Sequence, residues 1–486
     1  MVKFLPVLLL SALSVSFEGL VYDGMLGPSI GAVGTYLRIF LILALIVTGR
    51  RKVAAIVYLT FLGSSLTEVN FLQDQGFITA SAFLNYPGFQ ALRVPGLPFG
   101  WSTLLGLVIL IAGLHHQKKD DVLRAKLRVF LLFLAFGAAA LAFSVLSYLG
   151  GTFSGGVFAK DLNRFLISLF ALGPLFFNFT MKEVKETILG ITVGTLLSTA
   201  ALFHLGIARL YAGSSVALSE PAQAYVFLIA LLVPGIGGLV RTLMFLLVTG
   251  LAVASGFLVS GKTVISLVLL LVLASANIFG RRLSLRLRMI VLFMTLAPIM
   301  FVDFNVIGSF FIGQGYELAG YKIRQLAFMS NFSNLGAAIF FHSSGGNIVA
   351  ETLTVGAMLL GQIPEHLPLV GLGFGGQIVD HFHILELANA DSYPEESFQS
   401  GRFSGMHLAL LGYLFWGGIA GIAFAWTITV RYILISKEVW LSWALVMSFL
   451  IFGLADKFDA TLFAMLLSAV LAERPTSQPN RRMVAP

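Results

Sequence analysis

Long apolar segments separated by short polar connections recur along almost the whole chain. A helix of roughly 20 apolar residues crosses the hydrocarbon core of a bilayer, where only a helix satisfies its own backbone groups. About fourteen segments have this length and character. They lie near 4–22, 30–49, 53–71, 99–115, 128–149, 164–180, 187–206, 223–240, 242–260, 263–279, 289–306, 406–427, 439–455 and 459–472. The pattern predicts an all-α fold, a polytopic transmembrane helix bundle of about 14 helices.

The long stretch 307–405 interrupts this pattern. At roughly 100 residues it far exceeds a tight connection between helices. Apolar runs within it, such as 347–360, are too short to span a bilayer and suit helices that lie on the membrane surface. The sequence therefore predicts about eleven transmembrane helices in 1–306, a large extracytoplasmic loop with short helices in 307–405, and further transmembrane helices with a short cytoplasmic tail in 406–486. We expect the loop to form a cap over the bundle.

The basic residues set the expected orientation, because Lys and Arg gather in the cytoplasmic connections of membrane proteins. Lys and Arg outnumber Asp and Glu by 31 to 23. The basic clusters are Arg50–Lys52, Lys118–Arg128, Lys182 with Lys185, Arg281–Arg288, Arg431 with Lys437, and Arg481 with Arg482. With about fourteen spans, all of them fall on one side. We therefore expect a multi-pass protein of the cell (inner) membrane with both termini cytoplasmic and the large loop periplasmic or extracellular.

Composition narrows the class of protein. Hydrophobic residues make up 58% of the chain and charged residues 11%, whereas a soluble domain carries about 25% charged residues. A soluble protein is excluded, and the positive excess is a topology signal with no indication of nucleic-acid binding. The chain has no cysteine, so disulfides, thiolate nucleophiles and cysteine-ligated metals are excluded.

Several ionisable side chains fall at the predicted outer ends of spans, where such groups are candidates for function. These are Arg164, Lys262, Lys322, Arg324, Arg402 and His407. Each also has a structural interpretation. An arginine at the membrane rim can be an anchor that snorkels, Arg164 can pair with Asp161, and His407 can form a structural hydrogen bond.

A glycine run, Gly371–Gly376, follows Pro368 within the large loop. Its members Gly373 and Gly375 would let the backbone approach a ligand closely, and a flexible turn is the alternative. Downstream, His381 and His383 are spaced i, i+2, which places them on opposite sides of a helix and disfavours a metal site.

Nucleotide binding is not expected either. Lys262 follows Gly261, and Gly256 completes the spacing of a phosphate-binding loop, but no strand precedes it. We therefore predict no metal and no cofactor.

The C-terminal third carries short motifs of one membrane-enzyme superfamily. Leu367–Gly375 has the form Pro, apolar residues, Gly-x-Gly. His407 is followed, after Leu408 and nine further residues, by Gly418 and then Gly421. This spacing resembles the O-antigen ligase pattern, which has Asn, Ser or Gln at the position of Leu408.

Two further segments carry the same resemblance. Arg324 and Gly336 are separated by eleven residues, close to the polymerase pattern of Arg, ten residues, Gly. Ser260-Gly261-Lys262 is similar to a Ser-Arg pair at an outer helix junction. With its large outer loop before the last helices, the chain thus resembles the O-antigen polymerase and O-antigen ligase superfamily over roughly residues 220 to 430.

The resemblance implies a membrane glycosyltransferase that joins undecaprenyl-diphosphate-linked glycan repeat units into a surface or exopolysaccharide. Such a transfer needs cations on the leaving diphosphate and a base for the acceptor hydroxyl. Arg324, Arg402 and Lys262 would hold the diphosphate, and His407 would be the general base or an orienting group. Lys322, Arg164, Gly373 and Gly375 complete the expected substrate site.

The expected partners are the undecaprenyl-diphosphate-linked oligosaccharide, the lipid bilayer and other polysaccharide-assembly proteins such as a flippase or chain-length regulator. Three alternatives stay open: an O-antigen ligase that transfers polymer to an acceptor, a transporter or flippase, and a scaffold. Interrupted apolar segments such as Val233–Gly238 favour the transporter.

Overall fold

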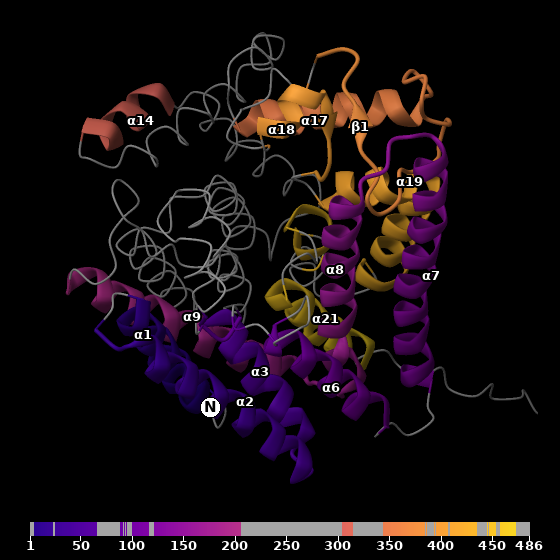
Figure 1. Cartoon of the computed structure of the whole chain (residues 1–486). Coiled ribbons are helices and arrows are strands. Elements are labelled where there is room, and N and C mark those ends of the chain that lie inside the picture. Colours follow the sequence, from indigo (N-terminus) through magenta and orange to yellow (C-terminus); the bar gives the residue numbers. More distant parts are fainter. Residues whose placement is uncertain are drawn as a thin grey trace, which may run out of the picture.

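The computed structural model is mostly helical, and Figure 1 shows its arrangement. It describes residues 4–22, 25–65, 88–90, 92, 94, 100–115, 121–205, 304–313, 344–383, 385, 393, 395–406, 409–434, 445, 447–452 and 457–472. Within these ranges, 4 helices are long and apolar enough to cross a membrane, which indicates a helical membrane protein. Their membrane-spanning parts are Phe4–Val21, Ser29–Val47, Asp121–Leu149 and Ala409–Ile433. The predicted spans 223–240, 242–260 and 263–279 lie outside the described residues.

The N-terminal half consists of helices that follow the predicted spans, and its first and last helices run parallel, with Ser11 against Thr195 and Ala12 against Ser198. Its elements are α1 (Phe4–Tyr22), α2 (Pro28–Val47), α3 (Arg51–Gly63), α6 (Trp101–His115), α7 (Asp121–Leu149), α8 (Gly155–Ala171), the short 3-10 helix η1 (Gly173–Phe176) and α9 (Met181–His204). The helix α8 begins nine residues before the predicted start of its span at 164 and ends at Ala171, before the 3-10 turn at Gly173–Phe176, so the predicted end at 180 is wrong. Its first turns include the exposed Lys160 and the buried Asp161, so they carry no continuous apolar signal.

The C-terminal half combines a cap with further helices. Its elements are α14 (Phe304–Gly313), α17 (Ser344–Leu359), β1 (Ile378–Val379), α18 (Glu395–Ser400), β2 (Arg402–Phe403), α19 (Ala409–Ile428), the π-helices η5 (Thr429–Ile433) and η6 (Met447–Phe452), and α21 (Lys457–Ala472). The helix α14 begins inside the predicted span 289–306 and continues through an apolar run to Gly313. The predicted short helix at 347–360 is present as α17.

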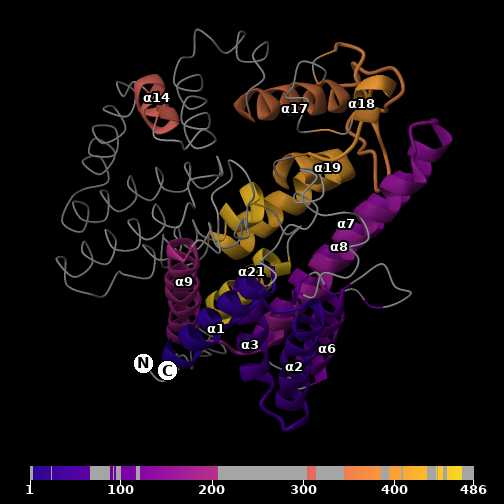
Figure 2. The same ribbon diagram turned by 60° about the vertical axis from the view of Figure 1, so that its left-hand side comes forward.

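We call the described residues of 344–406 the cap. In both views it lies across one end of α7, α8 and α19 (Figures 1 and 2). Its own apolar core joins it to α19, with members Ala350, Val355, Ala357, Met358, Ile363, Leu372, Ile378, Leu385, Tyr393, Phe403 and Phe415. Within this core the Tyr393 hydroxyl donates to the buried carboxylate of Glu351 at 2.6 Å. Burial, together with the charge of Glu351, raises the pKa of Tyr393.

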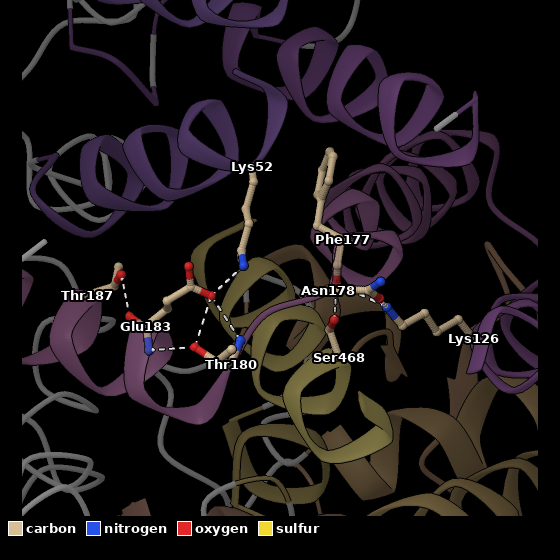
Figure 3. A network of polar contacts seen from close by, with 8 residues as sticks. All are labelled: Lys52, Lys126, Phe177, Asn178, Thr180, Glu183, Thr187 and Ser468. Atoms are coloured by element: carbon tan, nitrogen blue, oxygen red, sulfur yellow. Dashed lines mark hydrogen bonds and ion pairs between the residues drawn. The ribbon is translucent and has the colours of Figure 1, made fainter. Parts of the chain in front are cut away.

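A polar network joins three helix connections at the opposite end of the bundle (Figure 3). Lys52 at the start of α3 pairs with Glu183 at the start of α9. The fully buried Lys126 of α7 donates to the Phe177 carbonyl at 3.0 Å and to the Asn178 side chain at 2.8 Å. Lys52 and Lys126 therefore share one end of the molecule (Figure 3).

A buried ion pair lies within the helices near the other end. Arg38 of α2 donates to Glu18 of α1, and both side chains are nearly inaccessible. The Glu18 carboxylate also accepts from the Ser65 hydroxyl at 2.9 Å and from the Phe89 backbone N–H at 3.0 Å. The guanidinium carbon stands 5.2 Å from the centre of the Phe17 ring. Intramembrane charges are costly, so this pairing is what makes them tolerable.

Candidate functional site

The glycine run of the cap pairs with the connection between α7 and α8. Phe153 and Gly376 form an antiparallel bridge. On either side of it, the Ser154 N–H donates to the Gly375 carbonyl and the Gln377 N–H donates to the Thr152 carbonyl, both at 2.8 Å. The cap is thus fixed to the helices by backbone pairing as well as by its apolar core.

The same run inserts into a break in α19. Gly418 has φ 50° and ψ −127°, which no α-helix accommodates. The Leu372 N–H donates to the Phe415 carbonyl, and the Ile419 N–H donates to the Leu369 carbonyl, each at 2.8 Å. The loop backbone therefore replaces hydrogen bonds that the helix loses at its break, which a buried backbone requires.

Gly373 and Gly375 are needed where they lie because of their conformation and their surroundings. Their φ values are +68° and +79°, in the left-handed region that favours glycine. A Cβ on Gly373 would overlap the backbone of α7 at Ser144, and one on Gly375 would overlap Phe158 of α8. The close backbone approach that the sequence predicted is therefore made to the protein's own helices.

Asp161 anchors the run from α8. Its carboxylate is 2% exposed and accepts the Gly375 N–H at 3.1 Å. Burial raises the pKa of Asp161, and the Gly375 N–H and the positive charges of Arg164 and Lys160 oppose this rise. Arg164 is half-buried one turn further along the helix.

Arg402 approaches the same connection from the cap. It lies on β2, opposite Val379 of β1. Its guanidinium donates to the Gly151 carbonyl at 3.0 Å. The other N–H groups of this guanidinium have no partner among the described residues and are available to a ligand.

A histidine–carboxylate pair lies next to this arginine. The Nε2 of His381 is 2.7 Å from the Glu365 carboxylate, and the Glu365 carbonyl lies against Gly150. Partial burial works to raise the pKa of Glu365, but the His381 hydrogen bond, a backbone N–H and neighbouring positive charge outweigh it, so this pKa is below its ordinary 4.5. The carboxylate is accordingly ionised at neutral pH.

His366 is the buried neighbour of this pair. Its side chain is 8% exposed, and its Nε2 has no hydrogen-bond partner among the described residues. Burial lowers the pKa of His366 below its ordinary 6.5, against the opposing charge of Glu365. His366 is therefore neutral at pH 7.

The predicted site residues separate into two groups. Arg402 and Gly375 contact the α7–α8 connection and Gly373 packs against α7, whereas Arg164 lies on α8 three residues after Asp161. Lys262, Lys322, Arg324 and His407 lie outside the described residues. In the part of the chain that the structure covers, no three His, Asp or Glu side chains are grouped as a metal site would need.

The sequence interpretation missed Glu365, and it missed the Glu18–Arg38 pair. A charged residue inside an apolar span is a signal that would have found the pair. Glu365 has no such signal, because its contact with His381 arises only from the fold of the cap. No protein-family model, curated protein or solved structure matches the chain.

Proposed function

We propose that this protein is a membrane glycosyltransferase that joins undecaprenyl-diphosphate-linked glycan repeat units into a surface or exopolysaccharide. The observation that carries the proposal is the position of Arg402, whose guanidinium donates from the cap to the Gly151 carbonyl of the α7–α8 connection. Arg164 is a second cation on α8, three residues after the Asp161 carboxylate that accepts the Gly375 N–H. The two arginines belong to segments more than 200 residues apart. A cation held at this connection suits the binding of an anionic lipid headgroup.

The chemistry follows from these groups. As the acceptor hydroxyl attacks the anomeric carbon, the bond to the diphosphate breaks and negative charge builds on the leaving oxygen. Arg402 would stabilise that charge, since its planar guanidinium donates two parallel hydrogen bonds and stays protonated. Lys262, Lys322 and Arg324 would complete the cradle, and His407 would orient the acceptor hydroxyl.

Two related functions give different products from the same site. A ligase would transfer finished polymer to a separate acceptor, and a transporter would move the lipid-linked glycan without changing it. The break in α19 favours the transporter, because transport sites form at discontinuous helices. Against it, the loop backbone already occupies the hydrogen-bonding groups described at this break, including the Phe415 carbonyl and the Ile419 N–H.

The test uses purified protein in vesicles with a lipid-diphosphate glycan and without nucleotide or metal. A polymerase lengthens the lipid-linked glycan, a ligase moves it to an added acceptor, and a flippase changes only its side of the membrane. Loss of one diphosphate contact in Arg402→Ala should slow transfer on the order of 100-fold, with a similar loss for His407→Ala.

Arg124→Ala is the matched control. This exposed arginine lies at the far end of α7, where its pair with Asp121 is solvated. The control should keep the wild-type rate. Wild-type rates in Arg402→Ala and His407→Ala, at equal amounts of folded protein, would refute the proposal.

A further inference from the structure

The His381–Glu365 pair has the arrangement of a general base and its orienting group. The Glu365 carboxylate lies 2.7 Å from Nε2 of His381. The hydrogen bond at one ring nitrogen of a histidine determines whether the other nitrogen carries the proton or the lone pair. A carboxylate accepts the Nε2 proton, so the lone pair lies on Nδ1. This nitrogen has no partner among the described residues, and the side chain is 40% exposed.

The backbone around His381 is held on both sides. On its N-terminal side, the Asp380 N–H donates to the Gly401 carbonyl at 3.0 Å. On its C-terminal side, the Asp380 carboxylate accepts the Leu385 N–H at 2.5 Å. Asp380 itself is buried. The imidazole is thus carried by a fixed turn, which a catalytic group needs.

His381 also lies near Arg402, the residue proposed to bind the diphosphate. Glu365 packs its backbone against Gly150, and Arg402 donates to the carbonyl of the next residue, Gly151. The turn that carries His381 directly follows β1, the strand paired with Arg402. A cation for the leaving group and a base for the acceptor therefore meet at one connection.

The buried neighbour does not offer this combination. His366 is neutral, but its Nε2 is buried. His381 joins an accessible nitrogen to an orienting carboxylate.

We propose that His381, oriented by Glu365, is the general base that takes the proton from the acceptor hydroxyl. This assignment rests on the proposed transferase function. The hydroxyl oxygen forms the new bond to the anomeric carbon while its proton passes to Nδ1. The old bond to the diphosphate breaks, and its electron pair leaves with the diphosphate beside Arg402. The imidazolium is stabilised by Glu365 and returns the proton to solvent.

The experiment measures kcat, KM and the pH profile of kcat/KM in the vesicle assay. His381→Gln keeps a hydrogen bond to Glu365 but cannot take up the proton, so kcat should fall roughly 100-fold or more with KM within a few-fold. Glu365→Gln should show a smaller loss of kcat, and the acid limb of its kcat/KM profile should lie at a different pH from that of the wild type. The charged and titratable groups around His381 are Glu365, His366, Asp380 and Arg402, and none of the latter three is altered.

His383→Asn is the matched control, since it lies two residues away and asparagine tolerates the left-handed conformation. It should keep both the rate and the acid limb. Transfer that survives in His381→Gln and Glu365→Gln within about threefold overturns the assignment while leaving the proposed function intact. Absence of transfer by the wild type overturns the proposed function itself, and the assignment with it.

Discussion

Replacing Gly373 with alanine tests whether the loop holds the break in α19 together. Alanine at φ +68° costs about 1–2 kcal/mol. The new Cβ meets backbone atoms of α7, which cannot rotate away, and such overpacking adds about 1–3 kcal/mol. The run should therefore open more easily by about 2–5 kcal/mol. A change of about 1.4 kcal/mol alters an equilibrium constant tenfold, so the population of the open state should increase roughly 30-fold or more.

Hydrogen exchange of the purified protein in nanodiscs reports this opening. The reporters are the Leu372 and Ile419 amides, which are bonded across the break. Gly49→Ala is the control, because Gly49 has φ +78° but open space around it. It imposes similar strain in the α2–α3 connection and should leave both reporters protected. Equal protection of the reporters in Gly373→Ala and the wild type would show that the loop does not support the helix.

Three further outcomes are expected. Glu18→Leu leaves Arg38 buried without its partner and should destabilise the protein by about 3–5 kcal/mol in thermal unfolding, whereas the double variant with Arg38→Leu should recover most of the loss; an unaltered melting temperature in Glu18→Leu contradicts this. Because the pKa of His366 is lowered, the folded cap binds protons less readily than the unfolded chain does. The stability that neutral His366 contributes is therefore complete above pH 6.5 and is lost as the pH falls below it. Proteolysis of the cap should rise over that range and His366→Phe should remove the rise; a cap whose cleavage is independent of pH refutes this. In this cysteine-free chain, an impermeant thiol reagent applied to cells should label a cysteine at position 362 but not one at 124, and labelling of 124 alone would invert the orientation.

The length of the apolar segments was sufficient to predict some of the helices well. The first predicted span, 4–22, coincides with α1, and α17 is present close to its predicted range. The prediction failed at the start of α8, where Lys160 and Asp161 interrupt the apolar run. Periodicity detects a face that contacts lipid or core, and the first turns of α8 have a polar contact instead, the one between Asp161 and Gly375.

The candidate site was predictable only residue by residue. The sequence singled out Arg402 and the glycine run, but their approach to the α7–α8 connection depends on backbone pairing between 152–154 and 375–377 and on the bond from Arg402 to Gly151. Such pairing uses N–H and C=O groups that every residue carries, so it leaves no signature in side chains. The pairing of His381 with Glu365 is hidden for the same reason, because both lie in irregular turns.

The break in α19 bears on the choice between transfer and transport. A discontinuous helix in a transporter offers its free carbonyl and N–H groups to the cargo, which does not have to displace other hydrogen-bond partners from them. Here the Phe415 carbonyl and the Ile419 N–H are already bonded to the loop, so cargo would have to displace about two hydrogen bonds and the backbone packing of the run. A break that is filled in this way fixes the cap in place over the helices. Fixed geometry serves a reaction that must align a hydroxyl, an anomeric carbon and a diphosphate, and it hinders a site that must open alternately to both sides.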